Sequence, residues 1–288
     1  GADLDFKETN YLALDDNEKD MLQNVAEMKK AGQVKKIVVL INSANTLQVD
    51  FLKNNEYDVD ACMWIGDVGI SGINAVAEIL AGNVTPSGSL VDTYLYDNFS
   101  APAMMNFVPT VYEGYEEGII PEHAKTYMIY QEGIYVGYKY YETRYEDYVM
   151  QSGNSGAYEY HDDVAYPFGY GMSYTDFKYS DLKVKDSTDK VTVSFRLKNT
   201  GRRKGDEVAQ VYVRIPETGG IVPIKELKGF RRVPLEPGES RAIDIELDKE
   251  QLRYWDTTKE QFILPAGTFD VMVGASSKDI RLQTIIKL

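Results

Sequence analysis

Three polar side chains stand close after apolar segments of the sequence, where they could bind a ligand. Asn42 and Ser43 follow the apolar run 37–41, and Asp67 follows the run 61–65. Ligands of open α/β sheets bind beyond the carboxyl ends of the strands, so these three positions are candidates for a binding site. The same residue types also suit local turns and helix caps, which is their more common use.

The sequence gives less specific signals for acid–base catalysis by carboxylates, for a serine nucleophile and for phosphate binding. Cleavage of a glycosidic bond needs two carboxyl groups about 5–10 Å apart, and the 45 Asp and Glu residues do not single out a pair. No Gly-x-Ser-x-Gly elbow occurs, and Ser71 fits the start of a helix better than it fits a nucleophile. The turn Gly66-Asp-Val-Gly69 could approach a phosphate, but Asp67 would repel an anion.

Composition argues against several classes of function. The single cysteine, Cys62, allows no intrachain disulfide, and the two histidines, His123 and His161, form no metal-ligand spacing. Cys62 lies in an apolar run, so we expect it to be a small buried hydrophobe. The net charge of −14 argues against nucleic acid as a partner. We therefore expect no metal, no cofactor and no nucleic acid.

Signals for membrane insertion and secretion are not visible in the sequence. No segment approaches the ~20 consecutive apolar residues that cross a bilayer. Residues 1–7 contain neither the basic nor the apolar region of a signal peptide. We expect no membrane partner, and a cytoplasmic location is favoured over a secreted one.

The elements that would position the three polar side chains alternate between helices and strands. Asp15 and Glu18 form a capping-box pattern at the start of an amphipathic segment. Helices are predicted over 15–31 and 72–80, with a short helix within 44–53 and strands buried on both faces over 36–42 and 61–65. This alternation predicts an α/β/α layered sandwich with a mostly parallel sheet.

The second part of the chain has a different pattern, with short alternating segments between Gly, Pro and Asn turns. Strands are predicted over 190–198, 207–213, 241–247 and 268–273. Such spacing is typical of a β-sandwich of the fibronectin type III kind. Residues 1–172 carry 10 Lys and Arg against 27 Asp and Glu, whereas residues 173–288 carry 21 against 18. The shift in charge predicts two domains, 1–172 and 173–288.

A tyrosine-rich segment lies near the end of the first predicted domain. Residues 94–174 contain 17 of the 22 tyrosines. Their rings could stack on sugar faces. They could instead cover the sheet and join the domains, which is the more common use of aromatic side chains.

Several motifs in this chain resemble those of family 3 glycoside hydrolases. Tyr166-Pro-Phe-Gly-Tyr-Gly-Met-Ser-Tyr-Thr-Asp-Phe177 is similar to the family's Pro-Phe-Gly-x-Gly-Leu-Ser-Tyr-Thr-x-Phe, and Glu132-Gly-Ile-Tyr-Val-Gly-Tyr-Lys-Tyr-Tyr141 resembles its Glu-Gly-x-x-Val-Gly-Tyr-Arg-Tyr. The family's fibronectin type III-like domain is resembled in the same order by Asn199–Gly201, Gly205–Tyr212, Glu226–Phe230, Leu235–Glu239 and Val273–Ser277. Two loops depart from the family pattern. Residues 65–72 lack its Pro-Gly-Gln-x-Gly-Gly, and Ser89 stands where the family usually has a basic residue.

The resemblance implies the C-terminal part of a retaining exo-β-glycosidase of the β-glucosidase type, acting on a glucoside or oligosaccharide. In the family the nucleophile is an aspartate on a (β/α)8 barrel, which we expect as a partner in cis or on another chain. The family's acid/base glutamate would fall just before Gly1, with Asp3 at the end of its motif. Asp3 and Asp67 are the predicted substrate-binding residues, and Glu8 is a nearby substitute for the acid/base.

These implications leave no catalytic residue within the chain, so we expect no turnover by the chain alone. The alternative function is a carbohydrate-binding or scaffold module without catalysis, for which the tyrosine-rich segment is the support.

Overall fold

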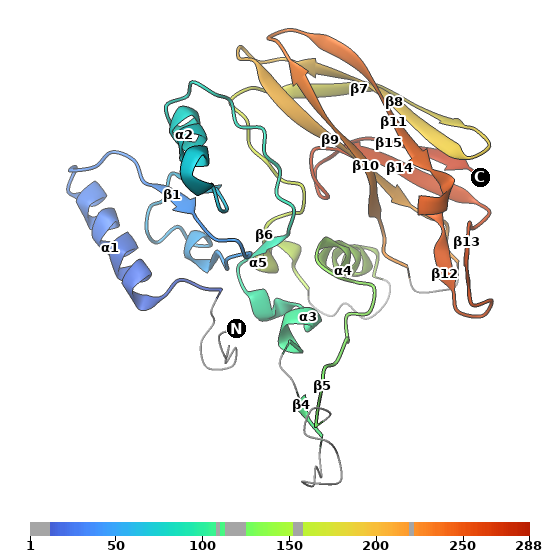
Figure 1. Ribbon diagram of the computed structural model, residues 1–288, viewed down its shortest axis with the longest axis horizontal. Helices are drawn as coiled ribbons and strands as arrows, with labels where there is room; N and C mark the ends of the chain where they lie inside the picture. The colour runs from blue at the N-terminus through green and yellow to red at the C-terminus, as the bar shows by residue number, and fades with distance from the viewer. Residues whose placement is uncertain (1–11, 108–109, 113–124, 152–157, 219–221) are drawn as a thin grey trace. The chain divides into compact units, whose positions relative to one another are not determined.

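The chain forms two compact units that interleave along the sequence (Figure 1). A computed structural model describes residues 12–107, 110–112, 125–151, 158–218 and 222–288. The first unit comprises 1–67, 94–136 and 161–165, and the second comprises 68–93, 137–160 and 166–288. The boundary expected after residue 172 from the shift in charge stays a prediction about sequence domains.

The first helix of the first unit, α1 (Asp16–Lys30), begins as the capping box predicts. The Glu18 backbone N–H donates to the Asp15 carboxylate over 2.8 Å, and the Asp15 N–H donates to the Glu18 carboxylate over 2.9 Å. These two bonds satisfy backbone donors that a helix start leaves unpaired. Leu22 and Ala26 form the buried face of the helix.

Two strands of the first unit, β1 (Val38–Ile41) and β2 (Ala61–Trp64), pair in parallel as the sequence predicts. Asp60 ties the start of this sheet to α1, because its carboxylate lies 2.7 Å from the ammonium groups of both Lys29 and Lys36. It also accepts the Ile37 backbone N–H over 2.9 Å. These contacts, with hydrogen bonds from Lys29 and Lys36 first, hold the pKa of Asp60 well below its usual range.

The expectation that both strands are buried on both faces is wrong. Val38 is 44% exposed and Leu40 is 36% exposed, whereas Ile37 and Ile41 are 5% exposed. One face of β1 therefore packs on apolar neighbours and the other meets solvent. The apolar composition of the run suggested a doubly covered strand, but composition cannot show which face receives a second layer.

The remaining elements of the first unit are short. The helix expected within 44–53 is reduced to the 3-10 turn η1 (Asp50–Leu52). The others are β3 (Tyr94–Leu95), η2 (Asn98–Ser100), α3 (Pro102–Met105), β4 (Thr110–Val111) and β5 (Thr126–Tyr127), together with β6 (Val164–Tyr166), which pairs with β3.

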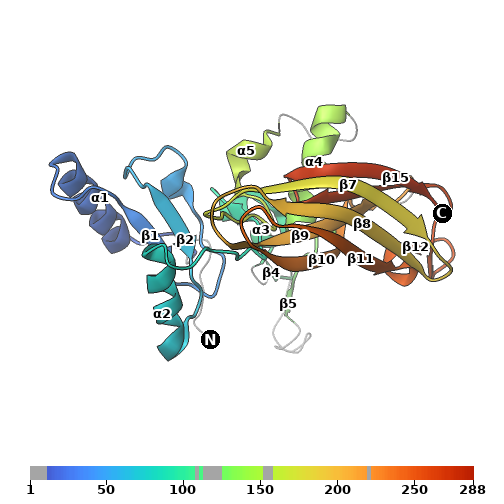
Figure 2. The ribbon, with the colours of Figure 1, turned by 90° about the horizontal axis from the view of Figure 1, so that it is seen from above.

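The second unit contains a β-sandwich, which confirms the all-β texture of the sequence (Figures 1 and 2). One sheet has the order β10-β9-β14-β15 and the other the order β11-β8-β7. Their bounds are β7 Phe177–Asp186, β8 Lys190–Asn199, β9 Gly205–Arg214, β10 Glu226–Leu235, β11 Ser240–Asp248, β14 Thr268–Gly274 and β15 Ile280–Lys287. Alternate side chains of both sheets form one buried cluster, as expected where two half-buried sheets face one another.

Helices and a hairpin complete the second unit. Helix α2 (Gly69–Leu80) begins three residues before the predicted range 72–80, and α4 (Tyr138–Met150) follows later in the chain. The short helix α5 (Tyr160–Asp163) begins with the last residue of the segment 137–160, and its residues 161–163 belong to the first unit. A 3-10 turn, η4 (Lys249–Leu252), leads into the hairpin of β12 (Tyr254–Asp256) and β13 (Gln261–Ile263).

Helix α4 is joined to the sandwich by a buried polar cluster around Glu142, which is 1% exposed. Its Oε1 accepts hydrogen bonds from the Tyr160 hydroxyl over 3.0 Å and from the Ser277 hydroxyl over 2.8 Å. Its Oε2 lies 3.1 Å from the ammonium group of Lys225, whose side chain is 7% exposed. A buried carboxylate is tolerated only with such partners, so this cluster fixes the helix against the β-strands.

Candidate functional site at the carboxyl edge of the parallel strands

The parallel pairing brings the predicted polar residues to one edge of the β1–β2 sheet. Ile41 pairs with Trp64, and the Ile65 backbone N–H donates to the Ile41 carbonyl over 2.9 Å. Asn42 and Ser43 leave this edge after β1, and Asp67 follows β2. We call residues 42–43 and 64–67 the carboxyl edge. The placement expected from strand order is confirmed, whereas ligand binding there stays a prediction.

Trp64 is the residue of the carboxyl edge that sequence reasoning missed. Its indole N–H donates to the Ser43 carbonyl over 2.8 Å, and the side chain is 37% exposed. Gly66 has φ +57°, and a β-carbon there would lie 3.2 Å from the indole ring. The turn after β2 thus needs glycine both for its backbone and for the ring beside it. An aromatic residue at the end of an apolar run, two positions before Gly66-Asp67, was the available signal.

Of the two predicted substrate-binding residues, only Asp67 lies among the described residues. Its side chain is exposed, three positions beyond Trp64 on the same turn. An exposed carboxylate three residues after a partly exposed indole supplies one polar and one apolar group from the same turn, and sugar hydroxyls and sugar rings can use both. Asp3 and Glu8 lie outside the described residues.

A cavity of about 290 Å³ lies at the end of β1. It is lined by residues 12–14, by Glu18, Met21 and Leu22 of α1, by Val39–Ile41, and by Asn42, Ser43, Leu47 and Phe51. This volume is at the lower end of the range of ligand pockets. Most of the lining residues are apolar, Glu18 supplies a carboxylate from α1, and Asn42 and Ser43 supply polar groups on the side of the carboxyl edge.

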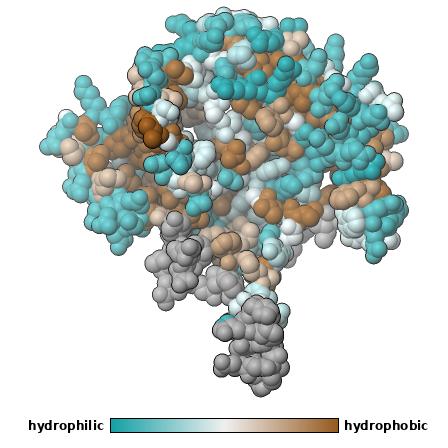
Figure 3. All heavy atoms as spheres, in the orientation of Figure 1, coloured by the Kyte–Doolittle hydropathy of each residue, from teal (hydrophilic) through white to brown (hydrophobic). Residues whose placement is uncertain are grey.

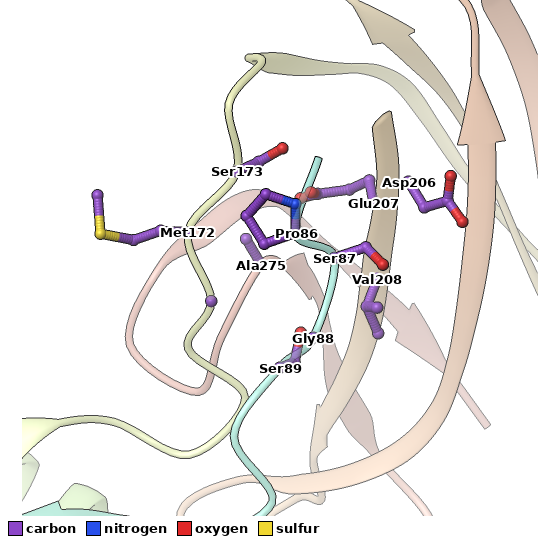
Figure 4. A pocket seen from close by; sticks show the side chains of 11 residues that line it. Pro86, Ser87, Gly88, Ser89, Met172, Ser173, Asp206, Glu207, Val208 and Ala275 are labelled. Carbon is purple, nitrogen blue, oxygen red and sulfur yellow. The ribbon is translucent and has the colours of Figure 1, made fainter. Parts of the chain in front are cut away.

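A second cavity, in the second unit, is too small for a sugar (Figure 4). Its volume is about 30 Å³, which is room for about one water molecule. The polar side chains near it already have partners. Arg232 lies 2.8 Å from the Asp206 carboxylate and donates to the Ser87 hydroxyl over 3.0 Å. Ser89, which replaces the family's usual basic residue, also lines this cavity.

Titratable groups also gather around Glu142, but they line neither cavity. The Lys278 ammonium lies 3.1 Å from the ring centroid of Tyr145 and 4.5 Å from that of Tyr160. Burial lowers the pKa of Lys278, and burial together with the neighbouring Glu142 charge raises the pKa of Tyr160. The Glu142 carboxylate already contacts Lys225 and the hydroxyls of Tyr160 and Ser277, and all four residues are buried. The cluster therefore stabilises the fold and is closed to substrate.

The tyrosine-rich segment contains both buried and exposed side chains, and stacking on sugars stays a prediction. Tyr141, Tyr158 and Tyr160 are at most 5% exposed and pack in the interior of the second unit. Tyr130, by contrast, is 75% exposed in the first unit.

Metal and thiol chemistry gain no support from the part of the chain that the structure describes. No group of three or more His, Cys, Asp and Glu side chains able to hold a metal occurs among those residues. His161 lies in α5, and His123 falls outside the described residues. Burial raises the pKa of the Cys62 thiol to about 11, so it stays protonated at neutral pH.

No described helix is long and apolar enough to cross a bilayer.

Comparison with known proteins assigns both halves of the sequence. The glycosyl hydrolase family 3 C-terminal domain matches residues 4–138, and a fibronectin type III-like domain matches residues 207–277. The chain is the C-terminal part of a family 3 glycoside hydrolase. The resemblance to family 3 glycoside hydrolases is therefore confirmed, and so is the fibronectin type III-like domain in the second part of the chain.

The relatives of this family 3 chain are β-glucosidases. Thermostable β-glucosidase B of Acetivibrio thermocellus is 30% identical over 282 residues, which cover 96% of this chain and 32% of the relative. A β-glucosidase of Kluyveromyces marxianus is 36% identical over 246 residues, covering 84% and 25%. The chain thus spans about a third or less of the length of these relatives.

Solved structures give the same assignment of fold. β-Glucosidase 3B from Thermotoga neapolitana, in complex with α-D-glucose, superposes with a TM-score of 0.78 at 31% identity. The match covers 97% of this chain and 34% of that protein. The family 3 assignment therefore applies to both units and not to the β-sandwich alone.

Proposed function

We propose that this chain is the accessory, C-terminal portion of a retaining exo-β-glycosidase that hydrolyses terminal β-linked glucosides. The observation that carries the proposal is the match of nearly the whole chain to about a third of several β-glucosidases. The bond-breaking aspartate would come from a (β/α)8 barrel, in cis or on a second polypeptide. The acid/base glutamate would precede the segment that contains Asp3. Double displacement through a glycosyl-aspartate is the mechanism that follows.

Exposed apolar side chains support a further layer of protein around this chain. In the first unit, Val38 and Leu40 of β1 meet solvent, and Figure 3 shows apolar side chains gathered over this region. In the second unit, Ile70 is fully exposed and Ile73 is 49% exposed on α2. Contiguous exposed apolar surface is typical of sites where another protein surface binds. We further propose that β1 and β2 belong to a larger, mostly parallel sheet with helices on both faces.

The first test is whether the chain alone hydrolyses a glucoside. The purified 288-residue chain and a polypeptide that also contains the barrel are compared on 4-nitrophenyl β-D-glucoside. The proposal expects hydrolysis by the longer protein and none by the chain. Hydrolysis by the chain alone that a mechanism-based glucosidase inhibitor abolishes would overturn the division of labour.

Stereochemistry and chain-end specificity need separate measurements on the longer protein. Proton NMR of the first product should show β-glucose before mutarotation, because two displacements at the anomeric carbon retain configuration. A cello-oligosaccharide should lose one glucose at a time. Initial α-glucose, or early internal fragments, would contradict the retaining or the exo assignment respectively.

We propose that Asp67 contributes a hydrogen bond to a substrate hydroxyl at the rim of the pocket, and Asp3 a second one. In the barrel-containing protein, Asp67→Asn should raise KM by about 10-fold, since a hydrogen bond to a charged group is lost. Asp16→Asn, an exposed carboxylate in the first turn of α1, is the matched control and should leave KM unchanged. An unchanged KM in Asp67→Asn would remove that residue from the site.

A carbohydrate-binding or scaffold module is the second candidate function, supported by Trp64 and the exposed tyrosine Tyr130. Calorimetric titration of the chain with oligosaccharides distinguishes the two. A module should bind with measurable heat in the absence of a barrel and should not stimulate hydrolysis when a barrel polypeptide is added.

A further inference from the structure

The hairpin β12–β13 presents two aromatic side chains to solvent. Trp255 pairs with Phe262 across the strands, and their ring centroids lie 5.2 Å apart at 71°. Trp255 is 50% exposed and Phe262 is 61% exposed. Edge-to-face contact covers at most one face of each ring, so an aromatic face remains available to a ligand.

The hairpin that carries these rings is held firmly at both ends. Leu252, just before β12, is 2% exposed in the sandwich core, and Leu264, just after β13, packs against the same core. At the tip, the Asp256 carboxylate accepts the backbone N–H groups of Thr258 over 2.9 Å and Lys259 over 3.0 Å. The rings therefore stand on a preorganised support, which reduces the entropy lost when a ligand binds.

The surroundings of the pair indicate the size and kind of ligand. Residues 256–261 of the tip are polar, and positions 257–261 are exposed. Two rings within such a border fall far short of the ~800 Å² per partner that a standard protein interface buries. A small ligand with a flat apolar face and polar groups around its rim fits them better. A β-linked glucose ring has this form, because its hydroxyls are equatorial and its C–H groups point to the two faces.

We propose that Trp255 and Phe262 form a surface binding site for β-linked glucan chains. The choice of a β-glucan rests on the proposed β-glucosidase function. The site itself rests on the exposed, paired and anchored rings. It would hold a polymeric or oligomeric substrate near the enzyme by stacking, without a charged contact and without any bond being made or broken.

The chain itself provides the reporter for a direct test, since Trp64 and Trp255 are its two tryptophans. In the 288-residue chain with Trp64→Phe, Trp255 alone supplies the indole emission. Titration with cellohexaose should shift this emission saturably, and maltohexaose, an α-linked glucan, should not. Equal binding of both sugars would overturn the β-glucan assignment.

Affinity electrophoresis in gels that contain soluble mixed-linkage β-glucan locates the site. Wild-type chain should be retarded, and Trp255→Ala should weaken retardation by about 10-fold, as expected for loss of one stacked ring. Trp255→Tyr, which keeps a ring, should retain part of the retardation, and this variant tests the site even if the alanine variant unfolds. Phe230→Ala removes another exposed aromatic, on β10, and should behave as wild type.

Three results would refute the proposal: no retardation of the wild-type chain, equal retardation of a folded Trp255→Ala, or equal loss in Phe230→Ala. Failure of the site is distinguishable from failure of the proposed function. In a barrel-containing protein, Trp255→Ala should leave kcat/KM for 4-nitrophenyl β-D-glucoside unchanged and lower only the rate on soluble β-glucan. If the short glucoside is not hydrolysed by the wild-type protein, the proposed function fails and the gel result still stands.

Discussion

Removal of the Lys225 ammonium group is the perturbation whose effect follows most directly from the structure. Lys225 and Glu142 form an ion pair at 3.1 Å with side chains 7% and 1% exposed. Substitution by methionine keeps the apolar stem but leaves the Glu142 carboxylate buried with one fewer cation. Loss of one partner of a buried pair costs about 3–5 kcal/mol. The hydroxyls of Tyr160 and Ser277 still donate to Glu142, which places the expected cost near the lower figure.

Urea unfolding measures this cost in the second unit if Trp255 is the only tryptophan. In the Trp64→Phe background, Lys225→Met should lower the unfolding midpoint by about 1–2 M, given an m-value of about 2 kcal/mol/M. The exposed pair of Lys190 and Glu246, at 2.6 Å, provides the matched control. Lys190→Met should barely move the midpoint, because ion pairs in water contribute little.

A double variant separates the pair from the loss of packing. Glu142→Gln with Lys225→Met removes both charges and keeps an oxygen that accepts from Tyr160 and Ser277. It should recover about 2 kcal/mol relative to the sum of the single effects. The reasoning is refuted if Lys225→Met is as mild as Lys190→Met, or if the double variant shows no coupling.

Three further predictions concern stability. Asn199→Ala should lower the free energy of unfolding in urea by about 2–4 kcal/mol. The fully buried Asn199 amide donates to the Arg203 carbonyl over 2.7 Å and to the Leu235 carbonyl over 3.1 Å, and its oxygen accepts a hydrogen bond from the Thr175 hydroxyl. Asp60→Asn should destabilise the chain at neutral pH, and the difference from wild type should fade in acid. The pKa of Asp60 lies below its usual 3.8, so the stability that its ion pairs contribute is present above that value. This stability is lost as the pH falls through the pKa of Asp60 in the folded state. A difference that persists unchanged in acid would contradict the ion-pair account. Glu207→Gln should raise the thermal unfolding midpoint at neutral pH, because burial raises the pKa of Glu207 above its usual 4.5 and so disfavours the ionised form. The gain should vanish below pH 4.5, where the carboxyl group is protonated in both states. A lower midpoint at neutral pH would refute this account.

Local patterns were sufficient to predict elements whose determinants are close in sequence. Asp15 and Glu18 stand three residues apart and form the capping box they predict. The alternation in 190–198 appears as β8, whose side chains alternate between core and solvent. Strand order alone also placed Asn42, Ser43 and Asp67 at one edge, because parallel strands must end on the same side.

Features that depend on distant residues could not be read in the same way. Trp64 was grouped with a buried strand, yet it is partly exposed and hydrogen-bonded to Ser43. The exposure of Val38 and Leu40 depends on which face of β1 receives a covering layer. Ser277 and Glu142, 135 residues apart, meet only because α4 packs on the sandwich.

The sequence by itself determined the family motifs, the start of α1, the alternation of the β-strands and the order of polar residues after β1 and β2. These follow from capping, periodicity and chain direction, which act over a few residues. The tertiary structure decided the buried Glu142–Lys225 pair, the exposed faces of Trp64 and Trp255, and the cavity beside Asn42. Burial and charge pairing are set by which surfaces pack together, and one-dimensional periodicity does not encode that choice.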